Sequence, residues 1–476
     1  MAHFAEYDRY DAVGLAELVK RREVKPLELL QAALKRSAEY TPRFNAVSHL
    51  MDEEARRTAA APPAGPLQGV PFLLKDLNIL YKGAPTTHGS RYFAGNVADH
   101  DWELTRRYRA AGLVIFGKTS TPELGLNMST EPRAFGPTRN PWNPEHSAGG
   151  SSGGAAAAVA AGILPVAHAT DGGGSIRIPA SFCGLVGLKP TRGRISFAPD
   201  LGEGWAGLGT PHVVSRTVRD SAAFLDVAAG PGVGDPYFAA PPGQSYLAEL
   251  DRPPGALRIA YSTDAPSGVG VHEECRIATE NAARLCEQLG HVVTAAAPTI
   301  DWPVFIGAVK TIIGANVWTT LQARTVALGR PPGAEDLEVI TRLWAERGRS
   351  TSAADYIRAT QVLHATGRRI ASFMDGRYDL ILTPTLSTPA IKLGTSDMMG
   401  ADLDKYLQDL FGRNCFNPQY NASGQPAITL PLHWSKDGLP VGVQFAARYG
   451  DEALLLRIAS QIEQAFPWAG RRPTGL

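Results

Sequence analysis

Residues 148–184 read AGGSSGGAAAAVAAGILPVAHATDGGGSIRIPASFCG, and this stretch decides both the fold and the chemistry. It contains two glycine-rich runs, one holding Ser151 and the other ending at Ser175, with an Ala-rich helix expected between them. The glycines just before Ser175 leave several backbone N–H groups unobstructed, so that these groups can converge on one point, as an oxyanion hole requires. Ser175 is therefore the better candidate for a nucleophile.

Three other interpretations of this stretch are weaker. A flexible linker would not lie so close to an Ala-rich helix and apolar strands. A phosphate-binding loop needs Gly-Lys-Ser/Thr at the start of its helix, and here Ala155 follows Gly154. Residues 149–153 formally match the G-x-S-x-G nucleophile elbow, but that motif follows a buried strand, and residues 140–146 (NPWNPEH) cannot form one.

A nucleophilic serine needs a base, and the histidines do not provide an obvious one. His168 lies in an apolar run, where a buried core histidine is the simpler interpretation. Lys75 follows residues 69–74 (GVPFLL), which predict a strand buried on both faces. Burial lowers the pKa of a lysine toward the range of a base at neutral pH, which makes Lys75 the alternative base. Taken alone, Lys75 could equally form an ion pair with Asp76.

Apolar runs alternate with amphipathic segments along the rest of the chain. Further strands are predicted at residues 114–118, 185–190, 258–261, 291–293 and 380–385, and a hairpin at 427–432 and 441–445. Helices are predicted at 14–38, where Pro26 starts the second of two, and at 104–111, 155–161, 272–289 and most of 304–347. The alternation favours an α/β fold. The Pro/Gly-rich residues 231–243 are expected to form a linker or a surface loop.

The composition excludes several classes of function. The 476 residues include 47 basic and 46 acidic side chains, and this balance gives no field that would hold a nucleic acid or an acidic membrane surface. The four cysteines and eleven histidines show no metal-ligand spacing, so we expect no metal and no cofactor. Residues 1–8 (MAHFAEYD) do not resemble a secretory leader, and the apolar residues 155–167 are too short to span a membrane. We expect a cytoplasmic protein.

Three separated blocks together resemble the amidase signature family of Ser-cisSer-Lys hydrolases. They are residues 69–76 (GVPFLLKD), 149–154 (GGSSGG) and 171–193 (DGGGSIRIPASFCGLVGLKPTRG). The resemblance extends from the N-terminal helices to residues 424–427 (GQPA). It implies a large, mixed, twisted β-sheet covered by helices on both faces. It also implies one domain over residues 1–476, with about 230–410 forming a variable substrate-cleft region.

The resemblance also implies the chemistry. Ser175 would be the nucleophile, Ser151 a bridging serine on a cis peptide bond, and Lys75 the base that draws a proton through Ser151. An acyl-enzyme would form on Ser175, and water would then hydrolyse it. The oxyanion would be held by the backbone N–H groups of Gly172, Gly173 and Gly174. Three further residues are expected to support these loops: Ser152, Asp171 and Arg177.

Within the family, residues 139–143 and 192–196, among other stretches, are most similar to nylon-oligomer amidases. The chain is least like them at about 300–415 and at 126–128, where a cleft of this family is expected to be lined. The pocket candidates are Leu126, Asn127, Met128 and Cys415. Four aromatic residues could line the pocket or belong to the core, namely Trp318, Trp344, Phe411 and Phe416.

We therefore expect an amidase that acts on small or oligomeric linear, cyclic or aryl amides, with a cyclic nylon dimer as one candidate substrate. A small-molecule amide is the expected partner, and a homodimer remains open. An aryl-acylamidase, an esterase and a urethanase are variants of the same chemistry. The glutaminase subunit of a tRNA-dependent amidotransferase is a further alternative, but Ile178 follows Arg177 where such subunits are expected to have Gln. A catalytically inactive scaffold is disfavoured because Lys75, Ser151 and Ser175 are all present.

Overall fold

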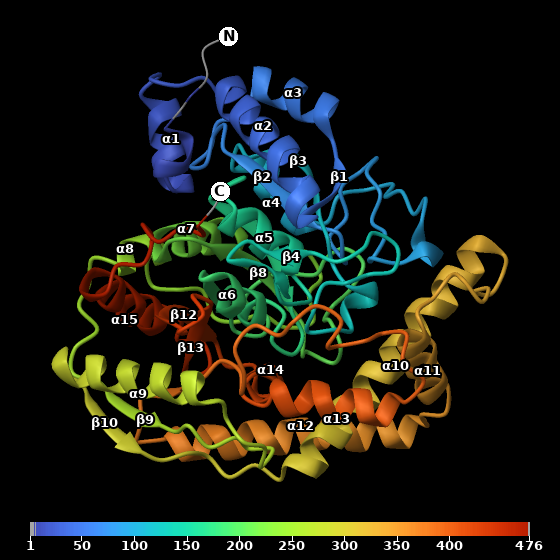
Figure 1. Ribbon diagram of the computed structural model, residues 1–476, viewed down its shortest axis with the longest axis vertical. Coiled ribbons are helices and arrows are strands. Elements are labelled where there is room, and N and C mark those ends of the chain that lie inside the picture. The colour runs from blue at the N-terminus through green and yellow to red at the C-terminus, as the bar shows by residue number, and fades with distance from the viewer. Residues whose placement is uncertain (1–3, 5, 475–476) are drawn as a thin grey trace.

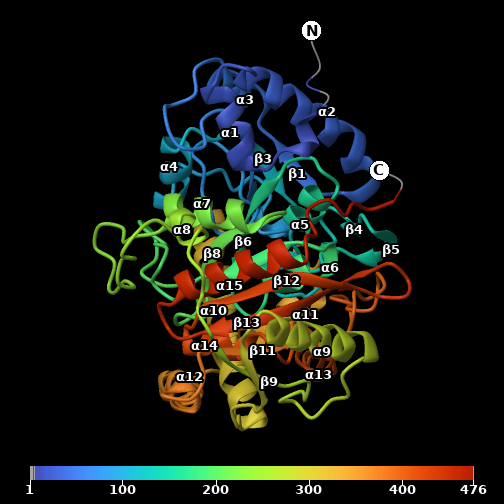
Figure 2. The same ribbon diagram turned by 90° about the vertical axis from the view of Figure 1, so that its left-hand side faces the viewer.

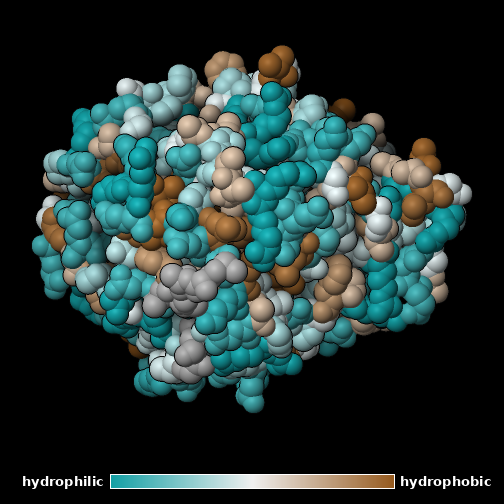
Figure 3. Space-filling view, turned by 90° about the horizontal axis from the view of Figure 1, so that it is seen from above, coloured by the Kyte–Doolittle hydropathy of each residue, from teal (hydrophilic) through white to brown (hydrophobic). Residues whose placement is uncertain are grey.

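The structure is a computed structural model that describes residue 4 and residues 6–474 (Figures 1 and 2). Residues 1–3 and 5, part of the segment predicted not to be a secretory leader, lie outside the described residues. The face seen in Figure 3 is mostly hydrophilic, with hydrophobic residues scattered over it in small groups.

An eight-stranded mixed sheet forms the centre, with the strand order β10-β9-β11-β13-β12-β7-β8-β6. Strand β9 runs parallel to β10 and β11, whereas the other paired strands are antiparallel. The strands are β6 (Val166–Asp171), β7 (Val186–Lys189), β8 (Thr210–Ser215), β9 (Arg258–Tyr261), β10 (Val292–Ala295), β11 (Leu380–Pro384), β12 (Ala427–Trp434) and β13 (Pro440–Ala447). The predicted hairpin is confirmed, with β12 and β13 joined by a turn at Gly438 (φ 76°).

Helices cover both faces of this sheet, as the resemblance implies. Because successive side chains of a strand point to opposite faces, Leu380 and Leu382 join the cluster that contains α9 and α15, whereas Ile381 packs with α12 and α14. The helices in these two layers are α9 (Glu273–Gln288), α15 (Glu452–Ala465), α12 (Ala353–Met374) and α14 (Pro418–Ser423). The central strands of the sheet are therefore buried on both sides, whereas the edge strand β10 is mostly exposed.

A smaller three-stranded sheet, of order β1-β3-β2, lies beneath the N-terminal helices at the top of Figure 1. Every residue of β2 (Pro71–Lys75) and β3 (Val114–Thr119) is buried, as their apolar runs predict, whereas β1 (Val47–Leu50) is partly exposed. The helices around it are α1 (Ala12–Lys20), α2 (Pro26–Phe44), α3 (Asp52–Ala60) and α4 (Glu103–Ala110). Pro26 opens α2, as predicted.

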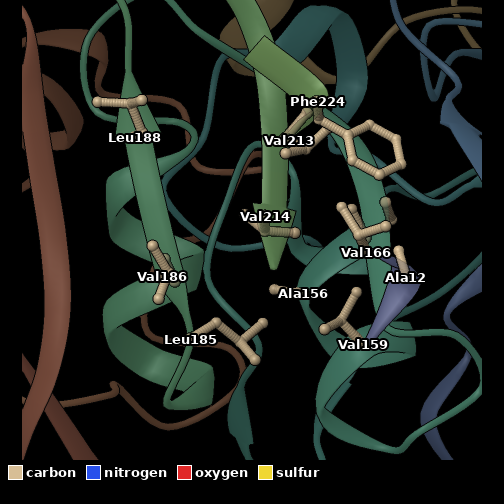
Figure 4. Close-up of a cluster of buried hydrophobic side chains, with 14 of the residues drawn as sticks. Ala12, Ala156, Val159, Val166, Leu185, Val186, Leu188, Val213, Val214 and Phe224 are labelled. Atoms are coloured by element: carbon tan, nitrogen blue, oxygen red, sulfur yellow. The ribbon is translucent and has the colours of Figure 1, made fainter. Parts of the chain in front are cut away.

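The Ala-rich helix α5 (Gly153–Ala160) explains why its segment is so poor in large side chains. Every one of its residues is buried. Figure 4 shows Ala156 and Val159 of α5 in the same cluster as Val166 of β6 and Val214 of β8. Small side chains let the helix lie close to these strands. This tight packing fixes the start of α5, where Ser151 and Ser152 lie.

A helical lobe from the second half of the chain lies beside the sheet in Figure 1. It contains α10 (Trp302–Leu328), α11 (Val339–Arg349), α12 and α13 (Leu403–Arg413), which share a hydrophobic cluster. By length and composition alone α10 could cross a membrane, but half of that stretch is buried inside the protein. Its contacts with α11 and α12 identify it as a core helix of the lobe.

The remaining elements are short, except for α7. They are η1 (Tyr7–Arg9), η2 (Arg91–Phe93), η3 (Glu123–Gly125), β4 (Arg139–Asn140), β5 (Asn143–Ser147), α6 (Arg177–Cys183), α7 (Val218–Ala228) and α8 (Tyr246–Glu249). The Pro/Gly-rich residues 231–243 form a mostly exposed surface loop between α7 and α8.

Candidate active site

Lys75 ends the buried strand β2 with its Nζ atom turned toward Ser151. Its Nζ donates to Ser151 Oγ at 2.7 Å and to Thr170 Oγ1 at 2.9 Å, and the side chain has no exposed surface. Burial lowers the pKa of Lys75 well below its usual value, although the negative charge of Asp171 acts in the opposite direction. A neutral lysine amine beside a serine hydroxyl is a competent general base.

The alternative ion pair between Lys75 and Asp76 is not formed. Asp76 instead accepts hydrogen bonds from the backbone N–H of Thr87, at 2.8 Å, and from the Thr87 hydroxyl group. The carboxylate therefore anchors the loop after β2 and leaves Lys75 to Ser151 and Thr170.

His168 is a core histidine, as predicted. It is fully buried on β6, and its Nδ1 accepts the backbone N–H of Lys75 at 3.2 Å. Burial lowers the pKa of His168 well below its usual value. The imidazole is thus a neutral support behind the lysine.

Ser151 lies just before α5, in a loop that requires glycines. The peptide bond between Gly150 and Ser151 is cis, as the resemblance implies. A Cβ atom at Gly150 would lie 2.6 Å from the carbonyl oxygen of Asn127, so that a side chain would not fit there. Gly149 has a φ of 82°, a conformation that glycine adopts readily. The loop thereby brings Ser151 to the lysine.

Ser175 lies in the turn between β6 and α6, at the edge of the cavity. Its carbonyl oxygen accepts the backbone N–H of Ser152 at 3.3 Å, which ties the two serine loops together. Within the described residues its hydroxyl group makes no hydrogen bond, so the link between Lys75 and Ser151 is formed and the link to Ser175 is not. Catalytic hydrogen bonds of this kind often tighten only when substrate binds.

The turn before Ser175 presents three backbone N–H groups with no acceptor in the described part of the chain: those of Gly172, Gly173 and Ser175. The N–H of Gly174 instead donates to Asp171 Oδ1 at 2.7 Å. The expectation that Gly174 contributes to the oxyanion hole is therefore wrong. The carboxylate of Asp171 also accepts the backbone N–H of Ile176, at 3.1 Å, and so takes up the donors at the start of α6.

Asp171 and Arg177 form a fully buried ion pair that holds this turn. Arg177 reaches the carboxylate through two donors, Nε at 2.9 Å and Nη2 at 2.8 Å. Although burial alone would raise the pKa of Asp171, the charge and the hydrogen bonds of Arg177 hold it well below its usual value. Ser152 supports the other loop through its hydroxyl group, which bonds to the backbone of Thr170 at 3.3 Å.

Replacing Arg177 with methionine is expected to lower the free energy of unfolding by about 3–5 kcal/mol at pH 7, because it leaves the buried carboxylate of Asp171 without its partner. Urea denaturation would measure the loss. Arg219→Met is the matched control, since Arg219 pairs with Asp11 while 43% of its side chain is exposed, and it should cost less than about 1 kcal/mol. Equal losses in both variants would contradict a special role for the buried pair.

Two pockets meet at Ser175. The first, of about 500 Å³, is lined by Gly125, Leu126, Asn127, Met128, Gly150, Gly172, Gly173, Ser175, Ile178, Trp205, Val309, Ile313, Trp344, Leu410, Phe411 and Asn414. The second, of about 420 Å³, is lined by Leu77, Asn78, Gly125, Ser151, Thr170, Asp171, Gly172, Ser175, Phe197, Gly204, Trp205, Gly209 and Thr210. Among the described residues, neither lining contains a lysine, an arginine or a glutamate.

The structure places the predicted pocket residues unevenly. Leu126, Asn127 and Met128 line the first pocket, but Cys415 does not. Its thiol is fully buried beside Ser267. Of the four aromatic residues considered, Trp344 and Phe411 line the first pocket, whereas Trp318 and Phe416 are not among its lining residues.

Trp205 lines both pockets and was not singled out from the sequence. A Cβ atom at Gly172 would lie 3.0 Å from its ring, so the indole lies directly on the turn that carries Ser175. Trp205, Ala206 and Gly207 all have positive φ values. The glycine-rich run at residues 202–209 (GEGWAGLG) is the signal that could have drawn attention to this loop.

Comparison with known proteins agrees with this geometry. The family model described as Amidase matches residues 28–456. The chain is 39% identical to a 6-aminohexanoate-cyclic-dimer hydrolase of Paenarthrobacter ureafaciens over 97% of its own length and 96% of the relative. The solved structure of a 6-aminohexanoate cyclic dimer hydrolase with its substrate superposes with a TM-score of 0.94 at 38% identity, covering 98% of this chain and 99% of the other. A bacterial aryl acylamidase superposes with a TM-score of 0.88 at 28% identity, covering 97% and 99%.

Proposed function

Because the chain belongs to the amidase family, we propose that it hydrolyses small uncharged amides, the cyclic dimer of 6-aminohexanoate among them, through an acyl-enzyme on Ser175. That it is a hydrolase of carbon–nitrogen amide bonds follows from the family. The observation that best supports this active site is the hydrogen bond of 2.7 Å between buried Lys75 and Ser151.

The reaction runs through a relay of two proton transfers. Neutral Lys75 takes the proton of Ser151 while Ser151 takes that of Ser175, and Ser175 Oγ bonds to the amide carbon. The carbonyl oxygen becomes an oxyanion, held by the N–H groups of Gly172, Gly173 and Ser175. As the carbon–nitrogen bond breaks, Ser151 gives its proton to the departing amine and regains one from Lys75. Water then attacks the ester by the same relay and releases the acid.

The two pockets take the two halves of the amide. Ser151 lines the second pocket and not the first. Since Ser151 returns the proton to the leaving nitrogen, the amine half lies in the second pocket and the acyl half in the first. Trp205, which lines both pockets, then contacts both halves.

The lining supports an uncharged substrate. Asp171 is the one acidic residue in the two linings described above, and Arg177 balances its charge. An ammonium or a carboxylate of the substrate would lose its hydration here without finding a partner. The cyclic dimer has neither charge, whereas linear oligomers and glutamine have both. This distinction also disfavours the glutaminase alternative.

An aryl acylamide is the second candidate, because aromatic rings surround the site. Trp205, Trp344 and Phe411 line the first pocket, and Phe197 lines the second. Aromatic side chains pack well against an aryl group. An aryl carbamate would use the same surfaces and the same relay.

We propose further that residues 230–410 supply much of the specificity. The acyl pocket receives Val309 and Ile313 from α10, Trp344 from α11 and Leu410 from α13, whereas Lys75, Ser151 and Ser175 lie on other elements. A cytoplasmic location remains a prediction from the sequence.

We expect kcat/KM for the cyclic dimer to exceed that for the linear dimer by at least tenfold, because burying an unpaired charge costs more than about 1.4 kcal/mol. Mass spectrometry of the products would measure this, with an acyl anilide, an aryl carbamate and glutamine in the same panel. Cleavage of the anilide or carbamate alone would favour the aryl alternative. Faster cleavage of the linear dimer or glutamine would contradict the argument from the uncharged lining.

A further inference from the structure

We propose that Asn414 is a positioning residue that holds the peptide group between Gly173 and Gly174, so that the oxyanion hole is formed before substrate arrives. This inference rests on the proposed function of Ser175. Asn414 Nδ2 donates to the carbonyl oxygen of Gly173 at 2.6 Å, and its side chain is buried at the edge of the acyl pocket.

The turn needs such an external restraint because glycines form it. A Cβ atom at Gly173 would meet nothing within 4 Å, so packing does not fix this residue. Gly174 has a φ of 126°, which side chains rarely allow. Two neighbouring glycines give the peptide group between them more rotational freedom than other residues would. Its orientation must therefore come from hydrogen bonds.

Both ends of this peptide group are held. Asp171 accepts the N–H of Gly174 at 2.7 Å, and Asn414 donates to the carbonyl oxygen of Gly173. Rotation of the group would break both bonds and bring the Gly173 carbonyl oxygen against the carboxylate of Asp171. It would also change the backbone on both sides, so that the N–H groups of Gly173 and Ser175 would no longer converge on the place where the oxyanion forms.

Asn414 is itself held in one orientation. Its Oδ1 accepts a hydrogen bond from Asn417 Nδ2 at 2.8 Å. Asn417 Nδ2 also donates to the carbonyl oxygen of Thr385 at 2.7 Å, which fixes the side chain of Asn417. The amide nitrogen of Asn414 is thereby directed at Gly173. Its backbone N–H also caps α13 by donating to Leu410 at 2.9 Å. The helix that lines the acyl pocket therefore also holds the turn of the nucleophile.

The test compares a transition-state mimic with an inert ligand of the same shape. A trifluoromethyl ketone that carries a six-carbon acyl chain adds Ser175 Oγ to its carbonyl carbon; the carbonyl oxygen becomes an oxyanion and the serine proton passes to the relay. The corresponding secondary alcohol fills the same pocket without reacting. Isothermal titration calorimetry gives both affinities and counts the competent sites, which separates weak binding from partial unfolding.

Asn414→Ala is expected to lower kcat by about tenfold to a hundredfold, somewhat less than the loss of a whole oxyanion donor, with KM changed less than about threefold. Affinity for the ketone should fall by the same factor as kcat/KM, whereas affinity for the alcohol should not change. Asn414→Asp, which keeps the shape but places an oxygen opposite the Gly173 carbonyl, should show a larger loss. If the alanine variant does not fold, the aspartate variant provides the same comparison.

Asn127→Ala is the matched control, because Asn127 lines the same pocket but donates to the carbonyl oxygen of Ser396 at 2.8 Å. It should change the affinities for ketone and alcohol equally. An equal change in the Asn414 variants, or none, would overturn the positioning role. Failure of the native protein to bind the ketone covalently, or undiminished binding by Ser175→Ala, would instead overturn the proposed function.

Discussion

Replacing Ser175 with alanine is expected to lower kcat about 10⁶-fold. A loss of this size is typical when the nucleophile of a catalytic relay is removed. The variant keeps Lys75 and Ser151 but has no oxygen to form the acyl-enzyme. The Ser175 hydroxyl makes no hydrogen bond within the described residues, so its removal should leave the thermal unfolding temperature nearly unchanged. Product analysis with the cyclic dimer or an anilide, together with a melting curve, checks both statements.

Ser181→Ala provides the matched control. Ser181 lies on the helix that follows the nucleophile, and its hydroxyl oxygen accepts the backbone N–H of Gly442 at 2.9 Å, away from both pockets. This variant should keep activity close to the native value. Substantial turnover by the Ser175 variant would assign the nucleophile elsewhere, and Ser151 would be the next residue to test.

Replacing Lys75 with methionine should lower kcat about 10⁴-fold, which is the upper end of the rate enhancement that a positioned general base provides. The native enzyme should lose activity as the pH falls through the lowered pKa of Lys75, because only the neutral amine accepts a proton. The variant should show no such acidic limb. A pH profile of kcat/KM for both proteins measures the difference.

The same substitution should raise the free energy of unfolding at pH 7. The pKa of Lys75 is lower in the folded protein than its usual ~10.4, so between the two values the unfolded chain binds the extra proton and native stability rises with pH. Methionine removes this penalty, and the gain should shrink as the pH approaches ~10. A lower stability of the variant at pH 7 would contradict the burial cost.

Lys118→Met is the control that distinguishes the loss of the general base from the loss of any buried lysine. Lys118 is also buried, and burial lowers its pKa to about 8. Its Nζ donates to the carbonyl oxygen of Ile79 at 2.9 Å and to Thr86 Oγ1 at 2.6 Å. This variant should retain the acidic limb of the native profile. Loss of that limb here would remove the argument for Lys75.

The sequence predicted the parts of the fold that local patterns determine. The apolar run before Lys75 is the buried strand β2, Pro26 opens α2, and Gly438 turns the hairpin of β12 and β13. The order of the strands could not be predicted, because it depends on contacts between distant segments. Thus β2 and β3 belong to a separate small sheet, although their sequences resemble those of the main strands.

The candidate site divides in the same way. The glycine-rich runs and the amidase resemblance placed Lys75, Ser151 and Ser175, but side chains that arrive from elsewhere in the chain could not be foreseen. Asn414 meets the nucleophile turn from the end of α13, and no local pattern distinguishes it from a surface asparagine. The same limit led to Cys415, the neighbour of Asn414, which is buried but does not line the pocket. Composition does not tell which of two adjacent side chains reaches a pocket.

The shortage of charged side chains around the two pockets has a consequence for product release. The neutral amide that we propose as substrate carries no charge into this cavity, whereas hydrolysis of an alkyl amide gives a carboxylate and an ammonium ion that the same cavity solvates poorly. Transfer from water into the cleft is thus more favourable for the substrate than for the charged product. We therefore expect the charged product to bind the cleft more weakly than the neutral substrate does, and to inhibit the enzyme little as it accumulates.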